Sequence, residues 1–138
     1  MMKISNPCVL QTQMTILRDQ VEKAFSRDTA SSVSMGSGPS AGQCAATAAI
    51  VFNKFGGSLV STNIKNESHW FNRIQVGDTL FDVDITGDQF GLPTIQISKA
   101  GTLYEHTRIR ERNELNEETI QRATKLARRA NIDLEKFE

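Results

Sequence analysis

The stretch GPSAGQCAATAAIVFNKFGG, residues 38–57, places a cysteine, Cys44, at the start of an alanine-rich helix. The pattern Ser40-x-x-Gln43 fits a capping box, in which the serine side chain binds a backbone N–H and the glutamine reaches back to the helix start. Apolar residues then follow on nearly every side, so the predicted helix at 41–55 should be buried. The two glycines at the end of the stretch are expected to stop it.

Two interpretations of Cys44 follow from this position. A cysteine in an alanine-rich helix is most often a small core residue. At a helix N-terminus, however, unpaired N–H groups and the positive end of the helix dipole favour the thiolate, so the same residue can be a nucleophile. A nucleophile needs a nearby acid–base partner, and the rest of the sequence has to supply one.

The composition argues against nucleic acids and membranes as binding partners of the protein. The chain has 138 residues, 38% of them hydrophobic, which is enough for one domain with its own core. Its 16 basic and 16 acidic residues cancel, so no net charge favours nucleic acid or an anionic membrane. No apolar run approaches the roughly 20 residues of a membrane span, and the start lacks a signal-peptide pattern. We therefore expect a soluble, cytoplasmic protein.

Cysteine and histidine usage predicts neither a metal site nor a cofactor. In a cytosolic chain, Cys8 and Cys44 are more typical of free thiols than of a disulfide. Cys44, His69 and Asp84 are each competent metal ligands, but no close Cys/His pair anchors a zinc site. The glycine-rich run before the helix lacks the lysine and the spacing of a phosphate-binding loop. The second histidine, His106, is expected at the surface.

The remaining elements follow from periodicity and from helix and turn signals. Apolar residues three and four apart predict helices, and aromatic and β-branched runs predict strands. The predicted elements are a helix at about 9–26, a loop at 27–40, the cysteine helix at 41–55, a hairpin at 69–86, further strand at 94–110 and a helix at 117–131, capped by Asn116. This order predicts a single α+β domain, with the cysteine helix on an antiparallel sheet and terminal helices flanking it.

One register of the hairpin makes an imidazole and a carboxylate neighbours. If Val76-Gly77 form a two-residue turn, counting outward places His69 directly opposite Asp84. Directly opposed side chains have Cβ atoms within about 5.5 Å of each other. We expect a one-residue slip of the turn to shift the pairing and to place the two groups on opposite faces of the sheet.

Cys44, His69 and Asp84 then form a candidate catalytic set. The thiolate would attack a carbonyl carbon, His69 would protonate the leaving group, and Asp84 would accept a hydrogen bond from the other ring nitrogen. Backbone amides near Gln43 would stabilise the oxyanion.

Four further residues surround this set in the prediction. Gln43 and Gln89 are expected to be polar groups near the site, and Trp70 is expected to form part of its wall. Asp82, which this register places opposite Phe71, is the alternative carboxylate for orienting the histidine.

These motifs resemble known families. A GQCA motif opening a buried helix, followed by histidine on one strand and aspartate on the next, is similar to the papain/transglutaminase-like superfamily. AFSRDTAS, GQCAATAAIVFNKFGG, HWFN and DITGDQF resemble the small bacterial YunG-like proteins over about residues 15–92. The resemblance implies a papain-like core in which Cys44, His69 and Asp84 are the active-site residues, and it selects Asp84 over Asp82.

The expected activity is that of a thiol hydrolase or acyltransferase acting on an amide or isopeptide bond in a peptide, a protein side chain or a small molecule. Amidase, peptidase and deamidase reactions stay open, because all begin with the same thiolate attack. The alternative is a binding or regulatory module that keeps the fold without catalysis. In papain-type proteases a glutamine several residues before the cysteine lines the oxyanion hole, and Gly38 stands in that place here.

Overall fold

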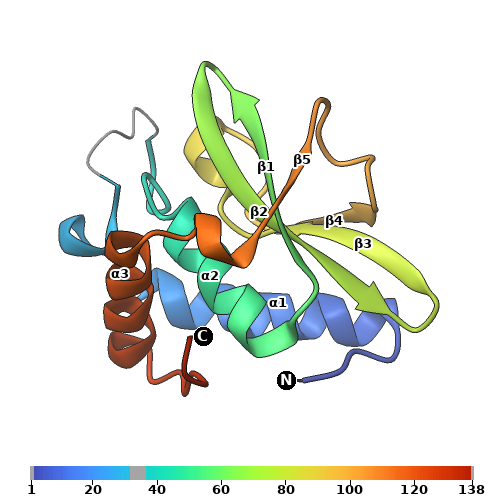
Figure 1. Cartoon of the computed structure of the whole chain (residues 1–138), viewed down its shortest axis with the longest axis horizontal. Coiled ribbons are helices and arrows are strands. Elements are labelled where there is room, and N and C mark those ends of the chain that lie inside the picture. The colour runs from blue at the N-terminus through green and yellow to red at the C-terminus, as the bar shows by residue number, and fades with distance from the viewer. Residues whose placement is uncertain (1, 32–36, 138) are drawn as a thin grey trace.

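An antiparallel sheet with helices packed along it makes up the protein (Figure 1). The computed structural model describes residues 2–31 and 37–137. The helical elements described are α1 (Pro7–Glu22), η1 (Arg27–Thr29), α2 (Cys44–Phe55), η2 (Gly87–Phe90), η3 (Arg112–Glu114) and α3 (Glu117–Arg129). The strands are β1 (Ser58–Ile64), β2 (Glu67–Val76), β3 (Thr79–Asp84), β4 (Gln96–Lys99) and β5 (Arg108–Arg110). The predicted α+β class is confirmed.

The strand order is β4-β3-β2-β1-β5, which places β2 and its histidine at the centre of the sheet. Strand β1 was not predicted, because its sequence SLVSTNI mixes polar and apolar residues without a clear alternation. It joins β2 through Lys65 and Asn66, both at positive φ (51° and 68°), the backbone of a tight hairpin turn. The predicted segment 94–110 divides into the short edge strands β4 and β5, and the loop between them returns to the site.

The predicted turn of the second hairpin is wrong by one residue. Val76 pairs with Thr79, so the turn is Gly77-Asp78. Val76 is buried in the core, and Gly77 has a φ of 57°, as the first position of a two-residue hairpin turn requires.

This correction moves every strand pairing by two residues. Asp82 faces Arg73 instead of Phe71, and His69 and Asp84 are not a direct pair. The expectation that a one-residue slip of the turn separates His69 from Asp84 is therefore wrong. The slip shifts the pairing by two residues, which leaves each side chain on its original face of the sheet, so the two still meet, now diagonally. Asp82 is engaged elsewhere, since its Oδ1 accepts from Arg73 Nε at 2.7 Å. It therefore does not orient the histidine.

Helix α2 lies between the sheet and α3 and forms the centre of the core (Figure 1). The side chain of Asn72 on β2 donates to the Ala48 carbonyl at 2.9 Å, which joins the sheet to the helix. The largest fully buried apolar side chains are Leu10, Met14, Ile50, Leu59, Phe71, Ile74 and Leu126. The alanine-rich sequence of α2 thus allows close packing on both sides, as expected.

The flanking helices begin at identifiable caps. Helix α1 begins at Pro7, earlier than predicted, because Asn6 Oδ1 accepts from the Val9 N–H at 3.0 Å. The predicted cap of α3 is confirmed, since Asn116 Oδ1 accepts from the Thr119 N–H at 2.8 Å. The predicted loop at 27–40 contains η1, and residues 32–36 of it lie outside the described residues. No helix within the described ranges is long and apolar enough to cross a membrane.

Candidate active site

Helix α2 begins at Cys44 itself, so the expected capping box is wrong. Gln43 is the N-cap residue, but its side chain binds elsewhere. Its Oε1 accepts from Thr29 Oγ1 at 2.8 Å, and its Nε2 donates to the Ser26 carbonyl at 2.9 Å. Gln43 therefore fixes the helix start against η1, and its side-chain amide is not available to a substrate. Cys44, partly exposed, is the first helical residue, where backbone N–H groups have no intrahelical partner.

His69 is fully buried beneath the site. Its Nε2 lies 2.7 Å from Asp84 Oδ2. The rings of Phe90 and Tyr104 meet the imidazole edge-on, with centroids 5.0 Å and 5.8 Å away. Its other nitrogen, Nδ1, is buried and has no hydrogen-bond partner among the described residues. The Asp84 carboxylate thus holds the ring by Nε2 alone.

Asp84, at the end of β3, is held at both carboxylate oxygens. Its Oδ1 accepts from the Thr86 N–H at 2.9 Å and from the Thr86 hydroxyl at 3.2 Å. Its Oδ2 accepts from the Tyr104 hydroxyl as well as from His69. Burial opposes ionisation, but the hydrogen bond and charge of His69, with the bonds from Tyr104 and Thr86, outweigh it and lower the pKa of Asp84. The carboxylate is therefore ionised at neutral pH.

The pKa of His69 is also set by burial and by hydrogen-bonded partners that act against each other. Burial alone would disfavour the charged imidazole, but the hydrogen bond and charge of Asp84 outweigh it, and Cys44 contributes in the same direction. Together they raise the pKa of His69 from 6.5 to about 10. Because Nε2 is bonded to Asp84, Nδ1 is the nitrogen left to face the Cys44 thiol. The structure thus brings the three predicted residues together.

Tyr104 belongs to this cluster and was missed by sequence reasoning. Its hydroxyl donates to Asp84 Oδ2 and accepts from Gln96 Nε2 at 2.8 Å. Burial and the charge of Asp84 raise the pKa of Tyr104, so the phenol remains a donor. The residue is the one tyrosine of the chain and lies in the loop between β4 and β5. No spacing in the sequence connects this loop with Cys44, His69 and Asp84.

Replacement of Tyr104 by phenylalanine tests this hydrogen bond. The change keeps the ring packed on His69 and on Phe71, but removes the donor to a buried carboxylate. We expect the free energy of unfolding to fall by about 1.5–3 kcal/mol, the usual contribution of a hydrogen bond to a charged group. Urea denaturation measures it, with Gln96→Ala as the control that keeps the bond to Asp84. An equal loss in both variants would contradict the assignment.

The remaining predicted residues have different positions. Trp70 is half-buried, and Arg110 Cζ lies 5.5 Å from its ring centroid. Gln89 does not face the thiol: its Nε2 donates to the Thr86 carbonyl at 3.0 Å and its Oε1 accepts from the Gly42 N–H at 3.3 Å. It therefore joins the segment before Cys44 to the turn after Asp84. His106 and Cys8 are both exposed.

The buried Arg18 of α1 is bonded to the turn that follows Asp84. Arg18 on α1 donates through Nη1 to Asp88 Oδ1 at 2.7 Å and to the Ile85 carbonyl at 2.6 Å. Ser40, expected to cap α2, instead donates its hydroxyl to Asp88 Oδ1 at 2.6 Å. Burial works against the Asp88 carboxylate, but the bonds from Arg18 and Ser40 outweigh it and lower the pKa of Asp88. Helix α1 thus holds the turn after Asp84, and the Asp88 carboxylate joins that turn to Ser40 in the segment before Cys44.

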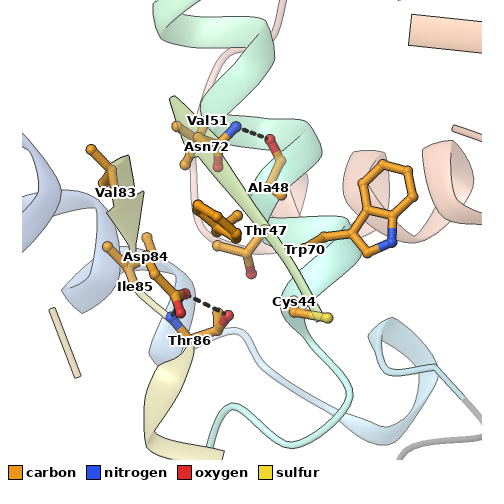
Figure 2. A pocket seen from close by; sticks show the side chains of 11 residues that line it. Cys44, Thr47, Ala48, Val51, Trp70, Asn72, Val83, Asp84, Ile85 and Thr86 are labelled. Carbon is orange, nitrogen blue, oxygen red and sulfur yellow. Dashed lines mark hydrogen bonds between the residues drawn. The ribbon is translucent and has the colours of Figure 1, made fainter. Parts of the chain in front are cut away.

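A small cavity lies between α2 and the strands, beside the thiol (Figure 2). Its volume of about 10 Å³ has room for roughly one water molecule. Residues that line it include Cys44, Thr47, Trp70, Asp84 and Thr86. Within residues 2–31 and 37–137, no group of three or more His, Cys, Asp or Glu side chains is placed to hold a metal ion.

Comparison with known proteins gives one family. The family model described as YunG protein matches residues 13–134. Comparisons with curated proteins and with solved structures gave no match. The YunG-like resemblance is therefore confirmed, over a longer span than the motifs that indicated it. Nothing in the comparisons indicates the papain/transglutaminase-like superfamily.

Proposed function

The chain belongs to the YunG protein family, and we propose that it is a cysteine-dependent hydrolase or acyltransferase acting on an amide or isopeptide bond. Cys44 is the nucleophile, His69 the acid–base group and Asp84 the residue that orients the imidazole. The observation that supports this most directly is that the two nitrogens of the His69 ring have different surroundings. Nε2 is hydrogen-bonded to Asp84 at 2.7 Å, while Nδ1 is buried and has no hydrogen-bond partner among the described residues. Cys44 also contributes to the raised pKa of this ring.

The proposed reaction has two halves. The Cys44 thiolate attacks the carbonyl carbon, and the leaving nitrogen takes a proton from His69 Nδ1 as the carbon–nitrogen bond breaks. Water or an acceptor amine, deprotonated by the now neutral His69, then attacks the thioester and releases Cys44. Asp84 keeps Nε2 as a donor throughout, which fixes the ring orientation. Water as acceptor gives hydrolysis or deamidation, and an amine gives acyl transfer.

We further propose a papain-like core and a reducing compartment. A cysteine at the first residue of a buried helix, followed by histidine on β2 and aspartate on β3, matches the order that the resemblance implied. A nucleophilic thiol has to stay reduced, which fits the cytoplasm.

An activated acyl ester tests the proposal without knowledge of the natural substrate. With 4-nitrophenyl acetate, we expect Cys44 to become acetylated and then to release acetate, because its thiolate has an acid–base partner. Release of 4-nitrophenolate gives the rate, and peptide mapping by mass spectrometry locates the acetyl group. The His69→Ala variant should acylate Cys44 at least about tenfold more slowly, because the thiol loses the neighbouring imidazolium that favours its thiolate.

Cys8 serves as the control inside the same molecule, because it is exposed and far from the histidine in sequence. The non-catalytic binding module is favoured by one observation: the Gln43 side chain is bound to Thr29 and Ser26 and so is lost to an oxyanion hole. If Cys44 is acetylated no faster than Cys8 in the wild-type protein, the hydrolase is ruled out and the binding module replaces it.

A further inference from the structure

The oxyanion that forms in the proposed reaction needs a hydrogen-bond donor in place of Gln43. When the thiolate attacks, the carbonyl oxygen becomes negatively charged, and preorganised donors at that point are usually the largest contribution to catalysis. The donor has to lie next to Cys44 and be free of other partners. The cavity beside the thiol supplies a place for one oxygen-sized group, since it holds about 10 Å³.

The hydroxyl of Thr47 meets both requirements. Thr47 is 1% exposed, and its Oγ1 has no hydrogen-bond partner within the described residues. It is one helical turn after Cys44, and side chains three residues apart lie on the same helix face and tilt toward the helix N-terminus. Figure 2 shows its oxygen directed into the space between Cys44, Asp84 and Thr86. A buried hydroxyl left unpaired costs about 1–3 kcal/mol, so its retention needs an explanation.

The other side-chain donors that line the cavity are either bonded or directed elsewhere. Figure 2 shows the indole of Trp70, with its nitrogen, directed away from Thr47, Asp84 and Thr86. Thr86 donates both its N–H and its hydroxyl to Asp84, and the Asn72 side chain donates to the Ala48 carbonyl. Asp84 also lines the cavity, but its charge is balanced by His69. Thr47 is thus the side-chain donor that remains.

We propose that this cavity is the oxyanion pocket of the site, which takes up the carbonyl oxygen of an acyl substrate with Thr47 Oγ1 as hydrogen-bond donor. As the Cys44 sulfur–carbon bond forms, the carbonyl π electrons move to the oxygen, which Thr47 and the free N–H groups at the start of α2 stabilise. The carbonyl re-forms when the leaving group departs with the proton from His69. This inference rests on the proposed function and identifies the substrate class as acyl compounds with a small, accessible carbonyl oxygen.

Two reagents separate an oxyanion donor from a residue that only supports the thiolate. Acylation by 4-nitrophenyl acetate passes through a tetrahedral oxyanion, whereas alkylation by iodoacetamide is a direct displacement and forms none. Thr47→Val removes the hydroxyl with almost no change in shape, and Thr47→Ser keeps it. Because Thr47 Oγ1 is buried and unpaired, Thr47→Val removes an unsatisfied hydroxyl and should be at least as stable as the wild-type protein, which urea denaturation checks.

We expect Thr47→Val to slow acylation of Cys44 by about 10- to 100-fold, toward the loss seen when one oxyanion donor is removed. Its alkylation rate should stay within about twofold of wild type, and Thr47→Ser should keep most of the acylation rate. Unchanged acylation, or equal losses with both reagents, would overturn the pocket while leaving Cys44 and His69 in place. A failure of the proposed function gives a different result. In that case His69→Ala leaves the acylation and alkylation rates of Cys44 unchanged, in the wild-type protein and in both Thr47 variants.

Discussion

Replacing Asp84 with alanine is expected to lower the free energy of unfolding by about 3–5 kcal/mol, the usual effect of removing one partner from a buried ion pair. The loss is large because His69 has no exposed surface and cannot exchange Asp84 for water. The Tyr104 hydroxyl and the Thr86 N–H lose their acceptor in the same change. Urea denaturation at pH 6 gives the value, provided that both proteins unfold in a single transition.

The size of this loss should depend on pH in a defined direction. Folding raises the pKa of His69 above 6.5, so its contribution is full below that pH and is lost as the pH rises toward about 10. Folding lowers the pKa of Asp84 below 3.8, so its contribution is full above that pH and is lost in acid. The difference between wild type and Asp84→Ala should therefore be greatest between about pH 4 and 6.5 and smaller at pH 9.

A surface aspartate provides the matched control. Asp19 forms an exposed i,i+4 pair with Lys23 at 3.1 Å, and Asp19→Ala should change stability by roughly 0.5 kcal/mol or less. The double variant Asp84→Ala/His69→Ala should lose less than the sum of the single losses, because the second change removes a histidine that is already uncompensated. Additive losses would show that the two side chains do not stabilise each other.

His69→Ala is expected to slow alkylation of Cys44 by iodoacetamide about tenfold at pH 6. Only the thiolate reacts, and an ordinary thiol with a pKa of about 8.5 is roughly 0.3% ionised at that pH. A neighbouring imidazolium increases the thiolate population, although part of the gain is offset because a more acidic thiol is a weaker nucleophile. The difference should disappear above about pH 9, where thiols ionise without assistance.

Site-resolved mass spectrometry follows Cys44 and Cys8 in the same samples, and the rate of Cys8 should not respond to the substitution. His106→Ala is the matched control, because this second histidine is exposed and forms no part of the cluster. Parallel rate–pH curves for Cys44 in wild type and His69→Ala would refute an activated thiol and remove the basis of the proposed chemistry.

The pairing of His69 with Asp84 could be predicted from the sequence for a specific reason. The predicted turn was one residue too early, yet this error moved the pairing by two residues, which preserves the face of the sheet on which each side chain lies. Diagonal neighbours on one face are still close enough for a 2.7 Å hydrogen bond. A shift of the strand pairing by an odd number of residues would have placed the two side chains on opposite faces of the sheet.

Other parts of the site could not be predicted, because they depend on contacts between distant segments. The capping pattern at Ser40 and Gln43 was misleading, since both side chains find partners in η1 and η2 that outcompete the helix start. Tyr104 reaches Asp84 through a loop whose course is set by the edge strands, and local periodicity carries no information about that course. No sequence pattern singles out Thr47, because its unpaired buried hydroxyl is visible only in three dimensions.

The order of the cluster along the chain has a consequence for biosynthesis. Cys44 leaves the ribosome before His69, Asp84 and Tyr104, and β5, which follows Tyr104, closes the sheet against β1. A nascent chain therefore carries an ordinary cysteine, because the groups that act on it are still to be made. If Cys44 is the proposed nucleophile, its thiol would gain these partners only after β5 has been made and has paired with β1, and a product that stops before β3 would carry Cys44 without Asp84 and Tyr104.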